Sequence, residues 1–207
     1  EKTAQQSYDF IEHYEIIFMA VFVILVILLV LYIVHENYRR DQELMKYAQT
    51  DALTGLYNKE TTKLRTDEIL STDKDMIHAF LILDMDCFKQ INDGYGHAVG
   101  DIVLQKFGQL LRDIFREDDI VGRIGGDEFV VVMKNIKMKE MAIAKAEELL
   151  TKTQQYEIKE LNGSAISISI GIAMAPEDGE CYMDLYKRAD QALYQAKRSG
   201  KARVCGY

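Results

Sequence analysis

The chain has 207 residues and a formal net charge of −8 at pH 7. An acidic chain lacks the clustered Lys and Arg of a nucleic-acid groove, so we expect no nucleic-acid partner. Its three cysteines, Cys87, Cys181 and Cys205, are an odd number without metal-ligand spacing. Neither a disulfide framework nor a zinc site is indicated, and a reducing compartment is expected.

The first distinctive segment runs from Ile16 to Val34, where every residue is uncharged and nearly all are Ile, Leu, Val, Phe or Met. A helix needs roughly 20 such residues to cross a bilayer. A buried core helix is one alternative, but such helices rarely lack a polar face. A signal peptide is disfavoured because acids precede the run and no small-residue cleavage site follows it. We predict one transmembrane helix over residues 16–34.

The charges that flank this span predict its orientation. Acidic residues precede it, whereas Arg39, Arg40 and Lys46 follow it. Because positive charges favour the cytoplasmic side, we expect a single pass through the inner (cytoplasmic) membrane with the C-terminal part in the cytoplasm. Residues 1–15 would be an extracytoplasmic tail. Since the sequence opens without Met inside a polar stretch, we expect an upstream domain before them.

A polar segment without Gly or Pro, residues 35–50, connects the span to the rest of the chain. Apolar residues recur there at spacings of four and three, interrupted at Asp41: Val34, Tyr38, Met45 and Ala48. The pattern fits a short coiled coil that continues the membrane helix, and a monomeric solvated helix fits it nearly as well. We predict a helical signalling linker.

The remaining residues alternate between helical and strand patterns. Helical composition or spacing covers residues 56–70, 99–115, 139–152 and 182–198, the last ended by Gly200. Strand-like runs cover residues 77–83 and 164–172, and the second alternates Ile with Ser and Gly as a half-buried strand does. With an internal hairpin, these elements predict one α+β domain over residues 51–207, a sheet with helices packed on it.

The hairpin lies over residues 121–132. β-branched and aromatic residues flank Gly125 and Gly126, a pattern typical of two strands joined by a tight turn. The glycines remove two Cβ atoms, so a bulky ligand can approach the backbone closely. Asp127 and Glu128 follow at once and make the tip acidic. Charged turns often only solubilise a sheet edge, so a functional role needs a second source of carboxylates.

That second source lies upstream, where the strand predicted over residues 77–83 ends in Asp84, Met85 and Asp86. If this strand neighbours the hairpin, Asp84 and Asp127 converge at one rim of the sheet. Converging carboxylates repel each other unless a divalent cation lies between them. Hard oxygen ligands with room for water and phosphates suit Mg²⁺.

Five motifs occur in order along the domain: Asp51-Ala-Leu-Thr-Gly-Leu-Tyr-Asn58, Asp84-Met-Asp-Cys-Phe-Lys-Gln-Ile-Asn-Asp93, Gly96-His-Ala-Val-Gly-Asp101, Gly125-Gly-Asp-Glu-Phe129 and Ala189-Asp-Gln-Ala-Leu-Tyr-Gln-Ala-Lys-Arg-Ser-Gly-Lys201. One pentapeptide is weak, whereas five motifs in register are specific. From Asp51 to about Val204, the chain resembles the GGDEF family of diguanylate cyclases. The resemblance implies a mainly antiparallel central sheet flanked by helices, as in nucleotidyl cyclases and polymerase palms. It also implies conversion of two GTP into cyclic di-GMP and two pyrophosphates by a homodimer in which each chain holds one GTP.

The resemblance assigns the metal ligands and the catalytic residues. Asp84, Met85 through its carbonyl, Asp127 and Glu128 would hold Mg²⁺, with Mn²⁺ as the alternative ion. The implied catalytic residues are Asp84, Asp127, Glu128 and Lys89. Glu128 matches the position that helps to deprotonate the attacking hydroxyl or supports a metal, and the alternative is a solvated turn acid.

Phosphates need donors as well. Backbone amides of the turn Asp86–Phe88 can form a small anion nest, and Lys89 adds a point charge. Lys197 and Lys201, at the end of the last predicted helix, resemble the family's distal phosphate contacts. For Lys201, a favourable position near the helix C-terminus is the competing explanation.

Guanine selection would fall to two polar residues. Asn92 can pair with O6 or N7 of the base, and Asp101 can accept from N1 and the exocyclic amine, whereas adenine presents the wrong pattern to both. Leu104 would line the pocket, and Gly125 and Gly126 would lie against the substrate. The alternative for Asn92 and Asp101 is helix capping, where both residue types are common.

Residues Arg116 to Asp119 form an RxxD motif that ends shortly before Gly125. GGDEF cyclases carry their product-inhibition site at this place. The resemblance implies that Arg116 and Asp119 bind cyclic di-GMP as an allosteric inhibitor, through Arg stacking and pairing and an Asp acceptor. A helix-end ion pair is the alternative.

Three other functions compete with the cyclase prediction. A non-catalytic GGDEF-like module would sense GTP or cyclic di-GMP, but the intact signature argues against it. A mononucleotide cyclase would share the fold, and only product analysis separates it from a diguanylate cyclase. A passive membrane anchor would not explain five motifs in register.

Overall fold

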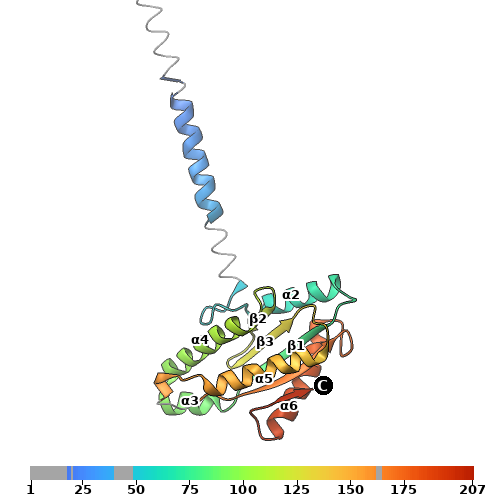
Figure 1. Ribbon diagram of the computed structural model, residues 1–207. Helices are drawn as coiled ribbons and strands as arrows, with labels where there is room; N and C mark the ends of the chain where they lie inside the picture. The colour runs from blue at the N-terminus through green and yellow to red at the C-terminus, as the bar shows by residue number, and fades with distance from the viewer. Residues whose placement is uncertain (1–17, 20, 40–48, 162–164) are drawn as a thin grey trace, which may run out of the picture. The chain divides into compact units, whose positions relative to one another are not determined.

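The computed structural model describes residues 18–19, 21–39, 49–161 and 165–207 and divides the chain into two units, Glu1–Ala48 and Gln49–Tyr207. Among the described residues, one helix, Val21–Arg39, is long and apolar enough to cross a membrane, with a mean hydropathy of 2.2 (Figure 1). This assignment rests on length and composition. The helix extends to Arg39, into the segment predicted to be a helical linker. The predicted tail, the start of the span and most of the linker, with Met45 and Ala48, lie outside the described residues.

The second unit is built on a five-stranded sheet in the order β2-β3-β1-β4-β5 (Figure 1). The strands are β1 His78–Met85, β2 Ile120–Arg123, β3 Glu128–Met133, β4 Ile168–Ala175 and β5 Val204–Gly206. Strand β1 is central and antiparallel to both β3 and β4, β2 is antiparallel to β3, and β5 alone is parallel to its neighbour β4. The predicted α+β fold with a mainly antiparallel sheet is confirmed.

Helices cover both faces of this sheet. They are α2 Lys59–Thr72, α3 Phe88–Tyr95, α4 His97–Ile114, α5 Lys139–Gln155 and α6 Tyr182–Arg198, with a short 3₁₀ turn at Lys159–Leu161. Alternate side chains of β1 enter two apolar clusters: Leu81 and Leu83 pack with α4 and α5, and Phe80 and Ile82 pack with α2 and α6. Because successive side chains of a strand point to opposite faces, β1 contributes to both apolar clusters and is buried along its whole length.

The structure corrects several predicted elements. Helix α2 begins at Lys59 rather than at residue 56, because the side chain of Asn58 caps it by accepting from the N–H of Thr61. Strand β4 was expected to be half-buried, but all eight of its residues are buried, since α6 covers the face that carries its small residues. Helix α3 and the three-residue strand β5 were not predicted, and elements this short leave little periodicity to detect.

Candidate active site

The acidic residues of two motifs meet where β1 and β3 are paired. In the antiparallel ladder Asp84 lies opposite Glu128, and the N–H of Met85 donates to the carbonyl of Asp127 at 3.2 Å. The strand predicted before Asp84 is therefore the direct neighbour of the hairpin. Asp84, Asp127 and Glu128 come together at one end of the sheet, as expected.

Burial and neighbouring negative charges disfavour the ionised forms of Asp84 and Glu128. Asp84 is only 8% exposed, and its Oδ2 lies 2.8 Å from Nζ of Lys197 on α6. Burial raises the pKa of Asp84; Lys197 opposes this shift, and the charges of Asp127 and Asp86 add to it. Burial also raises the pKa of Glu128, reinforced by the charges of Asp84 and Asp127. The site therefore concentrates negative charge, and a bound cation would offset it.

The oxygen donors fit a hard divalent cation. Within the described ranges no three His, Cys, Asp or Glu side chains are arranged to hold a metal. A metal here would rest on two carboxylates, Asp84 and Asp127, on the backbone carbonyl of Met85 and on substrate phosphates. Mg²⁺ is usually held in this way, by one or two carboxylates with water and phosphate completing its shell.

The two glycines of the hairpin turn differ in their surroundings. A Cβ atom on Gly125 would lie 2.9 Å from Oε2 of Glu128, so a side chain there would displace that carboxylate. A Cβ atom on Gly126 would meet no atom within 4 Å, and Gly126 is exposed. The first glycine makes room for Glu128, and the second leaves the turn open to a ligand.

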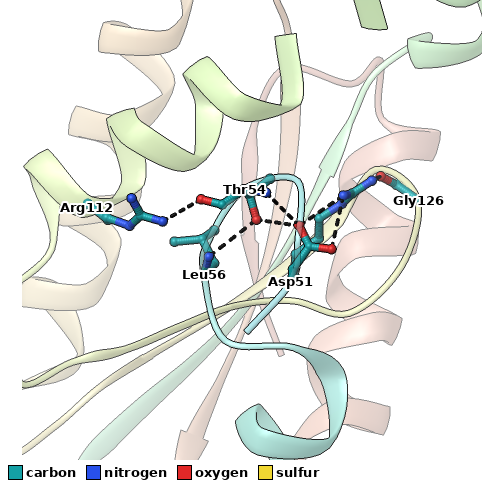
Figure 2. Close-up of polar contacts among 6 residues, drawn as sticks. Asp51, Thr54, Leu56, Arg112 and Gly126 are labelled. Carbon is teal, nitrogen blue, oxygen red and sulfur yellow. Dashed lines mark hydrogen bonds and ion pairs between the residues drawn. The ribbon is translucent and has the colours of Figure 1, made fainter. Parts of the chain in front are cut away.

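Arg123, the last residue of β2, ties this turn to the loop that opens the domain. Its Nε and Nη2 donate to the carbonyl of Gly126 at 3.2 and 2.8 Å, and its Nη1 donates to the carboxylate of Asp51 at 3.1 Å. That carboxylate also accepts from the N–H and hydroxyl of Thr54, whose carbonyl accepts from Arg112 on α4; Figure 2 shows these contacts. Burial tends to raise the pKa of Asp51, but its bonds to Thr54 and Arg123 hold it below the usual value.

Replacing Arg123 tests this anchor. Arg123→Ala is expected to lower the free energy of unfolding by about 2 kcal/mol, because the hydrogen bonds of its guanidinium to Gly126 and Asp51 are lost. Arg123→Lys keeps the charge without the planar fork, so an intermediate loss is expected. Urea unfolding of both variants beside the wild type measures the effect. An alanine variant as stable as the wild type would refute the anchoring role.

The turn after β1 is held by the side chain of Asp86, for which the sequence predicted no role. Asp86 is buried, and its carboxylate accepts from the hydroxyls of Ser167 and Ser169 at 2.6 and 2.8 Å and from the N–H of Ala202 at 3.1 Å. Cys87 follows with φ 59° as the N-cap of helix α3. A left-handed residue before a helix N-terminus orients successive amides, as the predicted anion nest requires.

Two lysines of the predicted phosphate site, Lys197 and Lys201, lie near the C-terminal end of α6. Helix α6 ends at Arg198, so Lys201 lies beyond it, in a turn where Gly200 and Lys201 have φ of 111° and 62°. The ammonium of Lys201 lies 3.3 Å from Sγ of Cys87, a contact that raises the pKa of Lys201. Lys201 therefore lies beside the turn that follows β1, and Lys89 is exposed in the first turn of α3.

The residues expected to read guanine lie on α3 and α4. Asn92 packs so closely against Gly100 that a Cβ atom there would lie 1.9 Å from Oδ1 of Asn92, which places Asn92 beside the residue that precedes Asp101. Neither Asn92 nor Asp101 is an N-cap, since Cys87 and Gly96 hold those positions, so the capping alternative fails. The side chain of Leu104, predicted to line the base pocket, belongs to the apolar core, as does that of Phe88, whose turn was predicted to bind phosphate.

The predicted inhibitory motif lies between α4 and β2. Asp119 is buried, and its carboxylate accepts from the N–H groups of Arg116 and Lys134, both at 3.0 Å. Its side chain thus organises the turn instead of pairing with the Arg116 guanidinium. Arg116 is exposed and lines a hollow of about 360 Å³ together with Tyr57 and Arg112.

Comparison with known proteins agrees with this geometry. The family profile described as "Diguanylate cyclase, GGDEF domain" matches residues 48–203. Diguanylate cyclase DgcS of Shewanella oneidensis is 37% identical over 168 residues, 80% of this chain and 55% of DgcS. The GGDEF domain of TpbB (YfiN) from Pseudomonas aeruginosa aligns with a TM-score of 0.71 at 35% identity, covering 76% of this chain and 93% of that one. That of DgcB from Caulobacter crescentus, solved with c-di-GMP, aligns with a TM-score of 0.70 at 26% identity, covering 77% and 95%. The chain spans 23% to 55% of the length of the curated relatives it matches.

Proposed function

This chain belongs to the GGDEF family of diguanylate cyclases, and on that premise we propose that it condenses two GTP into cyclic di-GMP and two pyrophosphates. The observation that carries the proposal is the meeting of Asp84, Asp127 and Glu128 beside Lys197 at one end of the β1–β3 pair. Asn92 and Asp101 lie near the turn after β1, where a bound nucleotide would extend its base. In this proposal these residues would contact a nucleoside triphosphate at its base and at its phosphates.

The chemistry is an in-line displacement at the α-phosphorus of one GTP. The 3′-oxygen of the other GTP forms a bond to that phosphorus while the bond to pyrophosphate breaks. A bound Mg²⁺, or Mn²⁺ as the alternative, would supply charge stabilisation for the attacking and leaving oxygens. In this proposal Asp84, Asp127 and the Met85 carbonyl hold the ion, and Glu128 supports it or accepts the hydroxyl proton. Lys89, Lys197 and Lys201 bind the phosphates.

A cyclic product needs two such displacements in opposite directions. Each chain offers one set of site residues, so we assign the reaction to a homodimer in which two sites face each other, each with one GTP. The helix Val21–Arg39 supports a membrane anchor. The positive charges that follow it favour an inner-membrane orientation with the cyclase domain in the cytoplasm. Dimerisation would then depend on the segment that joins helix and domain.

Product analysis tests the proposal. The detergent-solubilised chain is incubated with GTP and Mg²⁺, with ATP as a control, and the products are separated and identified. Cyclic di-GMP from GTP alone is expected. If a preparation forced to dimerise binds GTP but forms no cyclic product, the proposed reaction is refuted in favour of a sensor. A cyclic mononucleotide would assign the other cyclase chemistry.

Product inhibition through Arg116 is a further part of the proposal. Arg116→Ala is expected to raise the concentration of cyclic di-GMP that halves the rate by about 10-fold or more, because hydrogen bonds from a charged group are lost. Asp118→Asn, in the same turn and with a side chain 73% exposed, is the matched control and should keep the wild-type curve. Initial rates over a range of added product measure the effect. An Arg116→Ala curve that overlays the wild type would remove Arg116 from the inhibitory site.

A further inference from the structure

A groove lies beside the candidate active site, between helix α6 and the end of the chain. It has a volume of about 690 Å³, within the range of small-molecule sites. Glu128 and Lys197 line it, so it adjoins one acid and the lysine of the site described above. The other side chains that matter here are Asp190, Tyr194 and Tyr207.

One face of α6 points a carboxylate into this groove. Asp190, Tyr194 and Lys197 follow one another at spacings of four and three, which places them on the same side of the helix. Asp190 is exposed, and in the described part of the chain its carboxylate has no hydrogen bond or ion pair. Its charge acts on Glu128, whose pKa it helps to raise after the larger effects of burial, Asp84 and Asp127. The groove thus offers a free hydrogen-bond acceptor close to the proposed reacting centre.

Two exposed tyrosine rings supply the apolar part of the groove's lining. Tyr194 is 57% exposed and Tyr207 is 47% exposed. Arg198 lies over the ring of Tyr194 at 5.7 Å, and Arg188 lies over that of Tyr207 at 4.6 Å and donates to its hydroxyl. Each ring is thereby supported by a guanidinium, which makes it a stable flat surface for a sugar or a base.

A ligand that suits this lining carries hydroxyl donors and a flat or apolar face, and it keeps its phosphates away from the carboxylates. The ribose of a nucleotide has this chemistry, and a single Asp or Glu commonly accepts from its 2′-hydroxyl. We propose that the groove binds the ribose of the attacking GTP, which the second chain carries in, and that Asp190 accepts a hydrogen bond from its 2′-hydroxyl. This inference rests on the proposed function. Asp190 is then a substrate-binding residue that selects ribonucleotides over deoxyribonucleotides.

The arrangement places the neighbouring 3′-hydroxyl toward Glu128. In the displacement the 3′-oxygen bonds to the α-phosphorus of the GTP held beside Asp84, and pyrophosphate leaves with the electrons of the broken P–O bond. The hydroxyl proton passes to Glu128. With its 2′-hydroxyl on Asp190, the ribose cannot rotate its 3′-hydroxyl away, so the contact orients the nucleophile.

The test compares GTP with 2′-deoxyGTP, which keeps its 3′-hydroxyl. Using the solubilised full chain, kcat/KM is measured for both nucleotides. The wild type should prefer GTP by about 10-fold or more, as expected for a hydrogen bond to a charged group. Asp190→Ala should reduce the preference to about twofold or less by lowering the GTP value alone. Asp184→Ala, another exposed acid on α6, should keep the wild-type preference.

The Tyr194→Ala variant provides a second measurement of the same kinetic constants. It should lower kcat/KM for both nucleotides alike, because a ring contact does not sense the 2′-hydroxyl. A wild-type preference that persists in Asp190→Ala, or no preference in the wild type, would overturn the ribose contact while the cyclase proposal stands. A wild type that converts neither nucleotide would refute the cyclase proposal, and the ribose contact with it.

Discussion

Asp127→Ala is expected to abolish detectable formation of cyclic di-GMP, a loss of at least about 1,000-fold, the upper range for removing one electrostatic group from a reacting centre. Asp127 supplies one of the two carboxylates proposed to hold the divalent ion. Asp84 alone, neutralised by Lys197 at 2.8 Å, offers little remaining charge to attract it. Turnover of GTP at saturating Mg²⁺ measures the effect.

The fold of this variant should be intact. Asp127 contributes its backbone carbonyl, and not its side chain, to the hydrogen bond with Met85. Its side chain lies in a partly exposed turn, so thermal unfolding should match the wild type. Asp75→Ala, an exposed acid just before β1, serves as the control for loss of one negative charge. Normal product formation by Asp127→Ala would rule out the metal assignment.

Gly171→Ala is expected to have the largest effect on stability, about 3 kcal/mol or more. Gly171 lies in the middle of β4, where α6 packs directly on the sheet. A Cβ atom there would lie 2.1 Å from the carbonyl oxygen of Ala189 and 2.4 Å from the nitrogen of Leu193. These are backbone atoms of the helix, which cannot rotate away, so all of α6 would have to move. For a domain of this size the melting temperature should fall by about 6–12 °C.

This change should also reduce activity, because α6 carries Lys197 to within 2.8 Å of Asp84. Gly94→Ala is the matched control, since a Cβ atom on Gly94 meets nothing within 4 Å, and its stability should stay within about 1 kcal/mol of the wild type. Calorimetry of both variants measures the difference. A Gly171→Ala protein as stable as the Gly94→Ala protein would show that α6 can shift without cost.

Much of the fold and of the candidate site follows from local sequence features. The hairpin around Gly125 and the helix Tyr182–Arg198 have strong patterns, and the structure has both at the predicted places. The adjacency of Asp84 and Asp127 was predicted on the condition that two strands pair, and the ladder between β1 and β3 meets it. Alternation of apolar and polar residues and the glycines of a turn involve only a few neighbouring residues, so the sequence alone is enough to predict the elements that they form.

The supporting contacts were not predictable, because their partners lie far apart in the sequence. Asp51 and Arg123 are 72 residues apart, and Asp86 and Ser169 are 83 residues apart. Lys201 was expected at the end of the last helix, but its left-handed conformation and its contact with Cys87 depend on how the chain turns back after α6. No spacing rule relates such pairs, since strand order brings them together.

The amino-acid sequence by itself determined the family, the residue types of the reacting centre and an apolar helix long enough to span a bilayer. Chemistry of this kind depends on residue identity and short spacing, which a motif records. Only the tertiary structure decided that Arg123 holds the hairpin turn, that Asp86 holds the turn after β1, and that Asp190 faces a groove beside Glu128. These features depend on the packing of α6 and on strand order, which fix distances between residues that the chain itself leaves far apart.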